Sequence, residues 1–150
     1  LQKILQETTL TLLRNQEFWV YANLETGNVP FHSAESTFNR LSITERSKLK
    51  GESISNFGGK VSNISSSRAP STDLNPIKEF IVVTILISSK TKFSITEEIN
   101  SELLQEGLKT LGSISSNELL ALEVIWQPEE EGGSLSAEEL LTAYPNLKYL

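Results

Sequence analysis

The chain has 150 residues, of which 38% are hydrophobic and 21% charged, so it is long enough for one domain with an adequate core. Its net charge of −6 argues against general attraction to nucleic-acid phosphates or to anionic lipid. The chain has no cysteine and a single histidine, His32, which excludes disulfides, thiolate metal sites, cysteine nucleophiles and multi-histidine metal sites.

The longest apolar run is FIVVTILI, residues 80–87, which is far shorter than the roughly 20 residues needed to span a bilayer. The chain starts with leucine and contains no methionine. We therefore expect residues 1–150 to form a single soluble domain of a longer protein.

The N-terminal third predicts helices around one strand. Residues 1–14 have the apolar spacing of a helix, and residues 18–24 are rich in strand-forming types. Residues 34–41 and 43–54 predict two short helices, the second with a capping box formed by Ser42 and Glu45. The same letters, SITE, recur at 94–97, where we expect another helix to start.

Residues 62–76 are rich in serine and proline and predict a flexible loop within the domain. A strand at about 79–88, a helix at 95–111 and a strand at about 119–126 follow, which is the pattern of a right-handed βαβ unit. Gly112 is expected to be a left-handed C-terminal cap, and Gly107 to allow close approach of the helix to the sheet. The predicted fold class is α+β, with helices packed on a small sheet and an N-terminal helical layer.

The acidic segment 123–141, EVIWQPEEEGGSLSAEELL, suggests two kinds of site. Aligning Gly132 with the sixth position of a calcium loop places Gln127, Glu129, Glu131 and Glu138 at ligand positions. The match is poor because Gln127 brings no charge and a strand precedes the loop where a helix is needed. We therefore assign no metal ligands here.

A structural interpretation accounts for the same residues. Gly132 makes a turn, and Ser136 with Glu139 forms a capping box. Leu135 and Leu140 occupy the two positions of a hydrophobic staple. The segment therefore predicts a strand end, a turn and the start of a helix.

Glu123 is the only acid inside the core of a predicted strand, so its charge must be paired or neutralised if that face is covered. On the helix 43–54, Arg46 falls between Ile43, Leu49 and Ile54, which define the apolar sector. We expect a buried ion pair between Arg46 and Glu123, although an arginine there commonly extends its head group to water.

The only basic cluster consists of Arg40, Arg46, Lys48 and Lys50. It predicts either a surface for an acidic partner protein or membrane, or an ordinary solvated helix face. A nucleic-acid partner is disfavoured because the cluster is short and no aromatic-lined strand motif accompanies it. We assign no catalytic residues and no cofactor.

Two motifs resemble one known family. They are LSxxERSKL at residues 41–49 and EVxWxP…LSxxELLxxYPxL at residues 123–147. Together with neighbouring stretches they resemble the domain of unknown function 1517, found in cyanobacteria and plant chloroplasts. The resemblance implies a parent with an N-terminal hydrophobic segment, residence at a thylakoid, plasma or chloroplast membrane, and a link to acclimation of photosynthesis. It implies no catalytic residues.

The sequence therefore predicts a non-enzymatic regulatory or protein-interaction domain, itself outside the membrane, with an unknown protein partner. The alternative is a hydrolase or metal-dependent enzyme that uses Glu123 and the acidic residues of 129–139. An enzyme should have a deep pocket into which Glu123 or His32 projects, whereas a binding domain should have a shallow patch.

Overall fold

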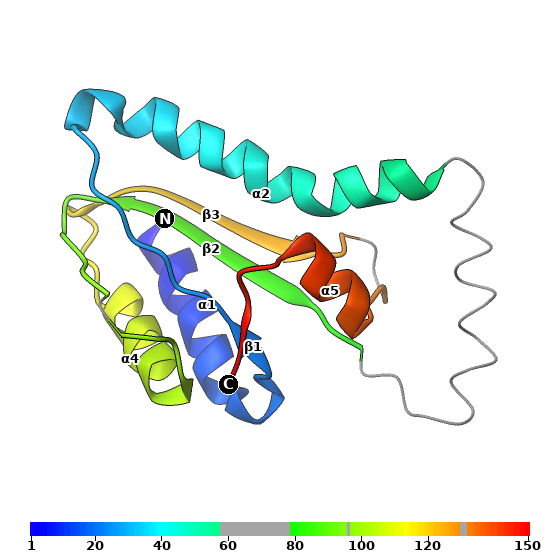
Figure 1. Cartoon of the computed structure of the whole chain (residues 1–150). Coiled ribbons are helices and arrows are strands. Elements are labelled where there is room, and N and C mark those ends of the chain that lie inside the picture. The colour runs from blue at the N-terminus through cyan, green and yellow to red at the C-terminus, as the bar shows by residue number, and fades with distance from the viewer. Residues whose placement is uncertain (58–78, 96, 130–131) are drawn as a thin grey trace. The chain divides into compact units, whose positions relative to one another are not determined.

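The computed structural model describes residues 1–57, 79–95, 97–129 and 132–150, with no side-chain description for 50–57 (Figure 1). The fold class is α+β, as predicted. The main elements are α1 (Gln2–Arg14), β1 (Tyr21–Ala22), α2 (Ala34–Phe57), β2 (Val82–Ser89), α4 (Ser101–Gly112), β3 (Leu119–Gln127), α5 (Ala137–Ala143) and β4 (Lys148–Tyr149). Two short 3-10 helices, η1 (Gln16–Phe18) and η2 (Phe31–Ser33), complete the described elements.

The chain divides into two compact units. Unit 1 comprises Leu1–Arg40, Ile85–Glu123 and Asn146–Leu150, and unit 2 comprises Leu41–Thr84 and Val124–Pro145. Helix α2 and strands β2 and β3 therefore contribute residues to both units. The expectation of a single domain stays a prediction, and the proposed loop at 62–76 lies outside the described residues.

The core of unit 1 forms where α1 packs against α4. Leu5 is completely buried and lies with Ile114 and Leu119, and partly buried apolar side chains from β2, β3 and α4 surround them. Thr9 is buried one turn after Leu5, and its hydroxyl donates to the Leu5 carbonyl at 2.9 Å. The N-terminal helix predicted from apolar spacing is confirmed.

The two glycines of α4 both serve close packing. A Cβ at Gly107 would lie 3.3 Å from Leu24 Cδ1, so the close approach is to the side chain of Leu24. A Cβ at Gly112 would lie only 2.8 Å from Thr9 Oγ1. The prediction of a left-handed cap at Gly112 was wrong, because Gly112 is the last helical residue and Ser113 follows with an αR conformation.

Strands β2 and β3 form a two-stranded sheet at the predicted positions, but they run antiparallel (Figure 1). The Lys90 amide just after β2 donates to the Glu118 carbonyl just before β3, at 2.9 Å. A right-handed βαβ crossover requires parallel strands, so that part of the prediction was wrong. The order strand, helix, strand is compatible with either direction, because a long connection can return the chain to either end of the first strand.

A second small sheet joins distant parts of unit 1. Tyr21 pairs with Tyr149 and Ala22 with Lys148, antiparallel, and the Leu150 amide donates to the Val20 carbonyl at 2.9 Å. The rings of Tyr21 and Tyr149 meet edge to face, with centroids 5.7 Å apart. The strand expected at 18–24 is thus shortened to two residues.

Helix α2 is continuous over 24 residues, where two short helices had been predicted. Ser42 is buried inside the helix and does not start one, so the predicted capping box at Ser42 and Glu45 was wrong. The second SITE motif does not start a helix either. Helix α4 starts at Ser101, where the Asn100 side chain accepts from the Leu103 amide at 2.8 Å.

Unit 2 contains the predicted turn and helix start after β3. Gly132 has a φ of 78°, which favours glycine. Ser136 Oγ accepts from the Glu139 amide at 3.2 Å, and the Ser136 amide donates to Glu139 Oε1 at 3.1 Å, so the capping box is confirmed. Leu135 and Leu140 are both buried, as a hydrophobic staple requires.

Candidate functional site

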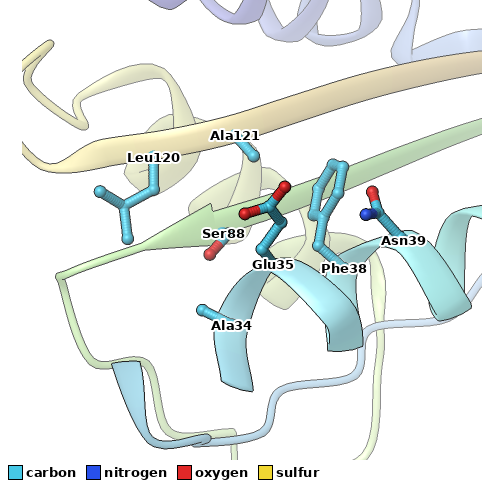
Figure 2. Close-up of a pocket in the computed structure, with 7 residues that line it drawn as sticks. All are labelled: Ala34, Glu35, Phe38, Asn39, Ser88, Leu120 and Ala121. Carbon is cyan, nitrogen blue, oxygen red and sulfur yellow. The ribbon is translucent and has the colours of Figure 1, made fainter. Parts of the chain in front are cut away.

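A hollow of about 380 Å³ lies in unit 1 between the first two turns of α2 and the sheet (Figure 2). Its lining residues are Ala34, Glu35, Phe38, Asn39, Ser88, Leu120 and Ala121. Figure 2 shows Glu35 and Phe38 reaching from α2 toward β3, while Leu120 extends from β3 toward α2. The hollow is open to solvent, as Glu35 and Asn39 are both exposed.

Two consecutive residues of β3 contribute to the hollow. Leu120 and Ala121 are consecutive, yet both line it, whereas Leu119 and Leu122 both pack in the core on the other side. In a regular strand, neighbouring side chains point to opposite faces. This arrangement could not be predicted from the alternation of apolar residues.

The polar groups of the hollow are one carboxylate, one amide and one hydroxyl, from Glu35, Asn39 and Ser88. These groups can hydrogen-bond a small polar group, but they do not form a nucleophile–base pair. Neither Glu123 nor His32 lines the hollow, and His32 is exposed in η2. This hollow is therefore not the deep pocket at Glu123 or His32 that the enzymatic alternative requires.

A charged cluster in unit 2 joins α2 to the segment after α5. Lys48 Nζ lies 2.8 Å from Glu45 Oε2 and 5.1 Å from the centroid of the Tyr144 ring. Tyr144 is 5% exposed, and its buried hydroxyl has no hydrogen-bond partner among the described residues. Burial, with a smaller contribution from the Glu45 charge, raises the pKa of Tyr144 to about 12.

Sequence reasoning missed this cluster. It placed Lys48 in a partner surface and did not link this lysine to Tyr144. The available signal was the spacing of Glu45 and Lys48, because residues three apart on a helix are neighbours. The link to Tyr144 joins two segments about 100 residues apart in the sequence, which no local pattern reveals.

The four predicted partner-surface residues do not all face solvent equally. Arg40 and Arg46 are exposed, whereas Lys48 is half-buried in the cluster with Glu45. The side chain of Lys50 lies outside the described residues. A partner surface on α2 stays a prediction.

The predicted ion pair between Arg46 and Glu123 also stays a prediction. Glu123 is half-buried on β3, but Arg46 is exposed on α2. Ile43 belongs to the apolar sector that was expected to bury Arg46. It is 65% exposed, so that sector is not buried at this residue. A double-mutant cycle with Arg46→Ala and Glu123→Ala tests the pair, and additive losses of stability would remove it.

The acidic loop does not assemble a metal site from the described residues. Glu129 and Glu138 are exposed, and Glu139 is engaged in the capping box. Across residues 1–57, 79–95, 97–129 and 132–150, no group of three or more histidine or acidic side chains could hold a metal ion. Glu130 and Glu131 lie outside that part of the chain.

In the same part of the chain, every helix is either too short or too polar to cross a bilayer. This agrees with the short apolar runs seen in the sequence.

Comparison with known proteins identifies the family. Residues 1–150 match the family described as protein of unknown function (DUF1517). Protein FLAP1 homolog A of Synechocystis is 39% identical over 97% of this chain, which covers 45% of that protein. FLUCTUATING-LIGHT-ACCLIMATION protein 1, chloroplastic, of Arabidopsis thaliana is 36% identical over 100% of this chain, which covers 38% of that protein.

No solved structure matches the chain. The chain spans less than half the length of these two curated relatives, so it corresponds to one part of each. The match over all 150 residues confirms the family resemblance that the two sequence motifs indicated. The chain belongs to the DUF1517 family of proteins of unknown function.

Proposed function

We propose that this chain is a non-enzymatic regulatory or protein-interaction domain that acts in the acclimation of photosynthesis to changing light. The observation that carries the proposal is the similarity, over the full chain, to an Arabidopsis protein named for acclimation to fluctuating light. The similarity to a cyanobacterial relative supports a role common to cyanobacteria and chloroplasts.

The site chemistry supports an interaction role better than an enzymatic one. The hollow of unit 1 is open and is lined by one carboxylate. The alternative enzyme would use Glu123 and the acids of 129–139, and no observation on the described residues favours it. The proposed location is the thylakoid or plasma membrane of a cyanobacterium, or a chloroplast membrane, with this domain held at the membrane by its parent.

The proposed partner surface is the exposed side of α2 with its basic residues. Arg40 and Arg46 present guanidinium groups on an otherwise acidic chain, and guanidinium groups bind carboxylates and phosphates through paired hydrogen bonds. The partner would be an acidic protein surface. Lys48 Nζ lies 2.8 Å from Glu45 Oε2, Arg40 and Arg46 also have interactions of their own, and Lys50 completes the predicted set.

The test replaces the matching segment of the Synechocystis relative with this chain and leaves the rest of that protein intact. A strain that lacks the relative should show altered chlorophyll-fluorescence responses to alternating light, with smaller changes under constant light. The chimera should restore the wild-type response. A strain without the relative that behaves like the wild type in both regimes would remove the proposed role.

Charge variants then separate the two function classes. Arg40→Glu with Arg46→Glu should abolish complementation by the chimera if α2 binds an acidic partner. Lys3→Glu with Arg14→Glu on α1 is the matched control, because it makes the same change in net charge at two other exposed positions. Loss of complementation by Glu123→Gln, with the fold intact, would instead favour the enzymatic alternative.

A further inference from the structure

The outer edge of strand β2 is unpaired in the described part of the chain. Among the described strands, β2 pairs with β3 alone, and Phe80, two residues before β2, forms a bridge with Leu135. Because the Lys90 amide points to Glu118, the alternation of a strand directs the backbone groups of Val83, Ile85 and Ile87 away from β3. Outside the ladder with β3, these three residues make no backbone hydrogen bond to another described residue.

The composition of β2 is that of an interior strand. From Phe80 to Ser89 the sequence has no charge and no proline, and six of the ten residues are valine, isoleucine or leucine. Natural edge strands are normally protected by lysine, proline, bulges or short length. Yet all eight residues of β2 are only half-buried. A strand with this composition, at an edge that no other described residue protects, favours a further neighbour.

Charges of opposite sign lie at the two ends of this uncharged segment. Glu79 precedes it, and Lys90 and Lys92 follow it, all three exposed. If a second copy of the strand approaches antiparallel, the acidic end of each copy lies beside the basic end of the other. Parallel approach would place like charges together, which is unfavourable across neighbouring strands.

We propose that two copies of this chain pair through the outer edges of β2, antiparallel and related by a two-fold axis. The dimer would contain a four-stranded sheet in the order β3, β2, β2, β3. A second copy is the favoured occupant because β2 itself supplies a matching edge, apolar side chains and complementary ends. Two copies of net charge −6 repel each other elsewhere, so the uncharged strand is where they can approach most easily. The inference does not depend on the proposed role in light acclimation.

The first test removes one outward amide. Val83→Pro deletes an N–H group that points away from β3, and proline is tolerated at such edge positions. We expect the unaltered chain to sediment as a dimer and Val83→Pro to sediment as a monomer with an unchanged circular-dichroism spectrum. Thr84→Pro is the matched control, since its N–H group points toward β3. We expect Thr84→Pro to destabilise the fold itself.

The second test exchanges the end charges. Glu79→Lys and Lys90→Glu should each weaken dimerisation roughly fivefold, because each change acts twice in a two-fold dimer. The double variant Glu79→Lys with Lys90→Glu should restore it. Along one strand the two residues are about 36 Å apart, beyond a Debye length of about 8 Å, so rescue must come from contact between copies.

Three outcomes would overturn the proposal. One is a chain that stays monomeric at every concentration, including a monomer that instead binds an extended peptide from another protein. Another is a Val83→Pro variant that dimerises as the unaltered chain does. The third is a double charge exchange that dimerises no better than either single variant.

Discussion

Replacing Gly112 with alanine should destabilise unit 1, although alanine is the better helix former. A Cβ at this position would lie 2.8 Å from Thr9 Oγ1, a distance that real Cβ atoms essentially never show. Thr9 has little freedom to move, because it is 2% exposed and its hydroxyl donates to the carbonyls of Leu5 and Gln6 at 2.9 and 3.0 Å. The helix backbone or the threonine must shift.

The magnitude follows from two opposing contributions. Overpacking a filled core costs about 1–3 kcal/mol, whereas glycine to alanine inside a helix gains about 1 kcal/mol. The gain is smaller at Gly112 because it is the last residue of α4. We therefore expect Gly112→Ala to lower the free energy of unfolding by about 1–2 kcal/mol, or the melting temperature by roughly 2–8 °C.

The assay is urea denaturation followed by circular dichroism, with Gly107→Ala as the matched control on the same helix. Its Cβ would lie 3.3 Å from the end of the Leu24 side chain, which can adjust, so we expect a change between zero and a gain of about 1 kcal/mol. In the Thr9→Ala background the clash is removed, and Gly112→Ala should cost nothing. If Gly112→Ala is as stable as Gly107→Ala, or equally harmful with alanine at position 9, the packing argument fails.

Three further changes test other parts of the structure. Leu5→Ala should cost about 2–5 kcal/mol because Leu5 is completely buried, whereas Leu10→Ala, at 47% exposure, should cost far less in the same denaturation experiment. Ser136→Ala should cost about 1 kcal/mol through loss of the α5 cap, and a variant equal to the unaltered chain would contradict the capping role. Tyr144, with a pKa of about 12 in the folded chain against 10.0 when unperturbed, ionises first in the unfolded state as the pH rises. Stability should therefore fall by roughly 2–3 kcal/mol between pH 10 and 12, at about 1.4 kcal/mol per pH unit. Tyr144→Phe should lose that pH dependence and be as stable or slightly more stable at pH 7, since the buried hydroxyl has no hydrogen-bond partner among the described residues.

The predictions that succeeded concern interactions between residues that are close in the sequence. The turn at Gly132 and the cap at Ser136 depend on residues within a few positions of each other, so their sequence patterns carry the whole interaction. The positions of β2 and β3 also followed from runs of strand-forming residues. The α+β class and the positions of β2 and β3 could thus be predicted from the sequence.

The predictions that failed depend on distant contacts. Ser42 has the sequence of a helix cap, but it lies buried within a single long α2, so tertiary packing overrides the local start signal. The role of Gly112 is set by Thr9, more than 100 residues earlier. The cluster of Lys48 and Tyr144 and the hollow beside Leu120 likewise need the folded chain before they exist.

The pairing of β1 with β4 has a consequence for synthesis of the protein. Residues 21 and 22 acquire their strand partners only from residues 148 and 149, and the Val20 carbonyl acquires its donor only from Leu150. The N-terminal residues of a nascent chain are synthesised first, so β1 has no strand partner until about 130 further residues have been translated. Unit 1 therefore cannot be completed on the ribosome before residue 150 has left the exit tunnel, and a long-range closure of this kind is intrinsically slow.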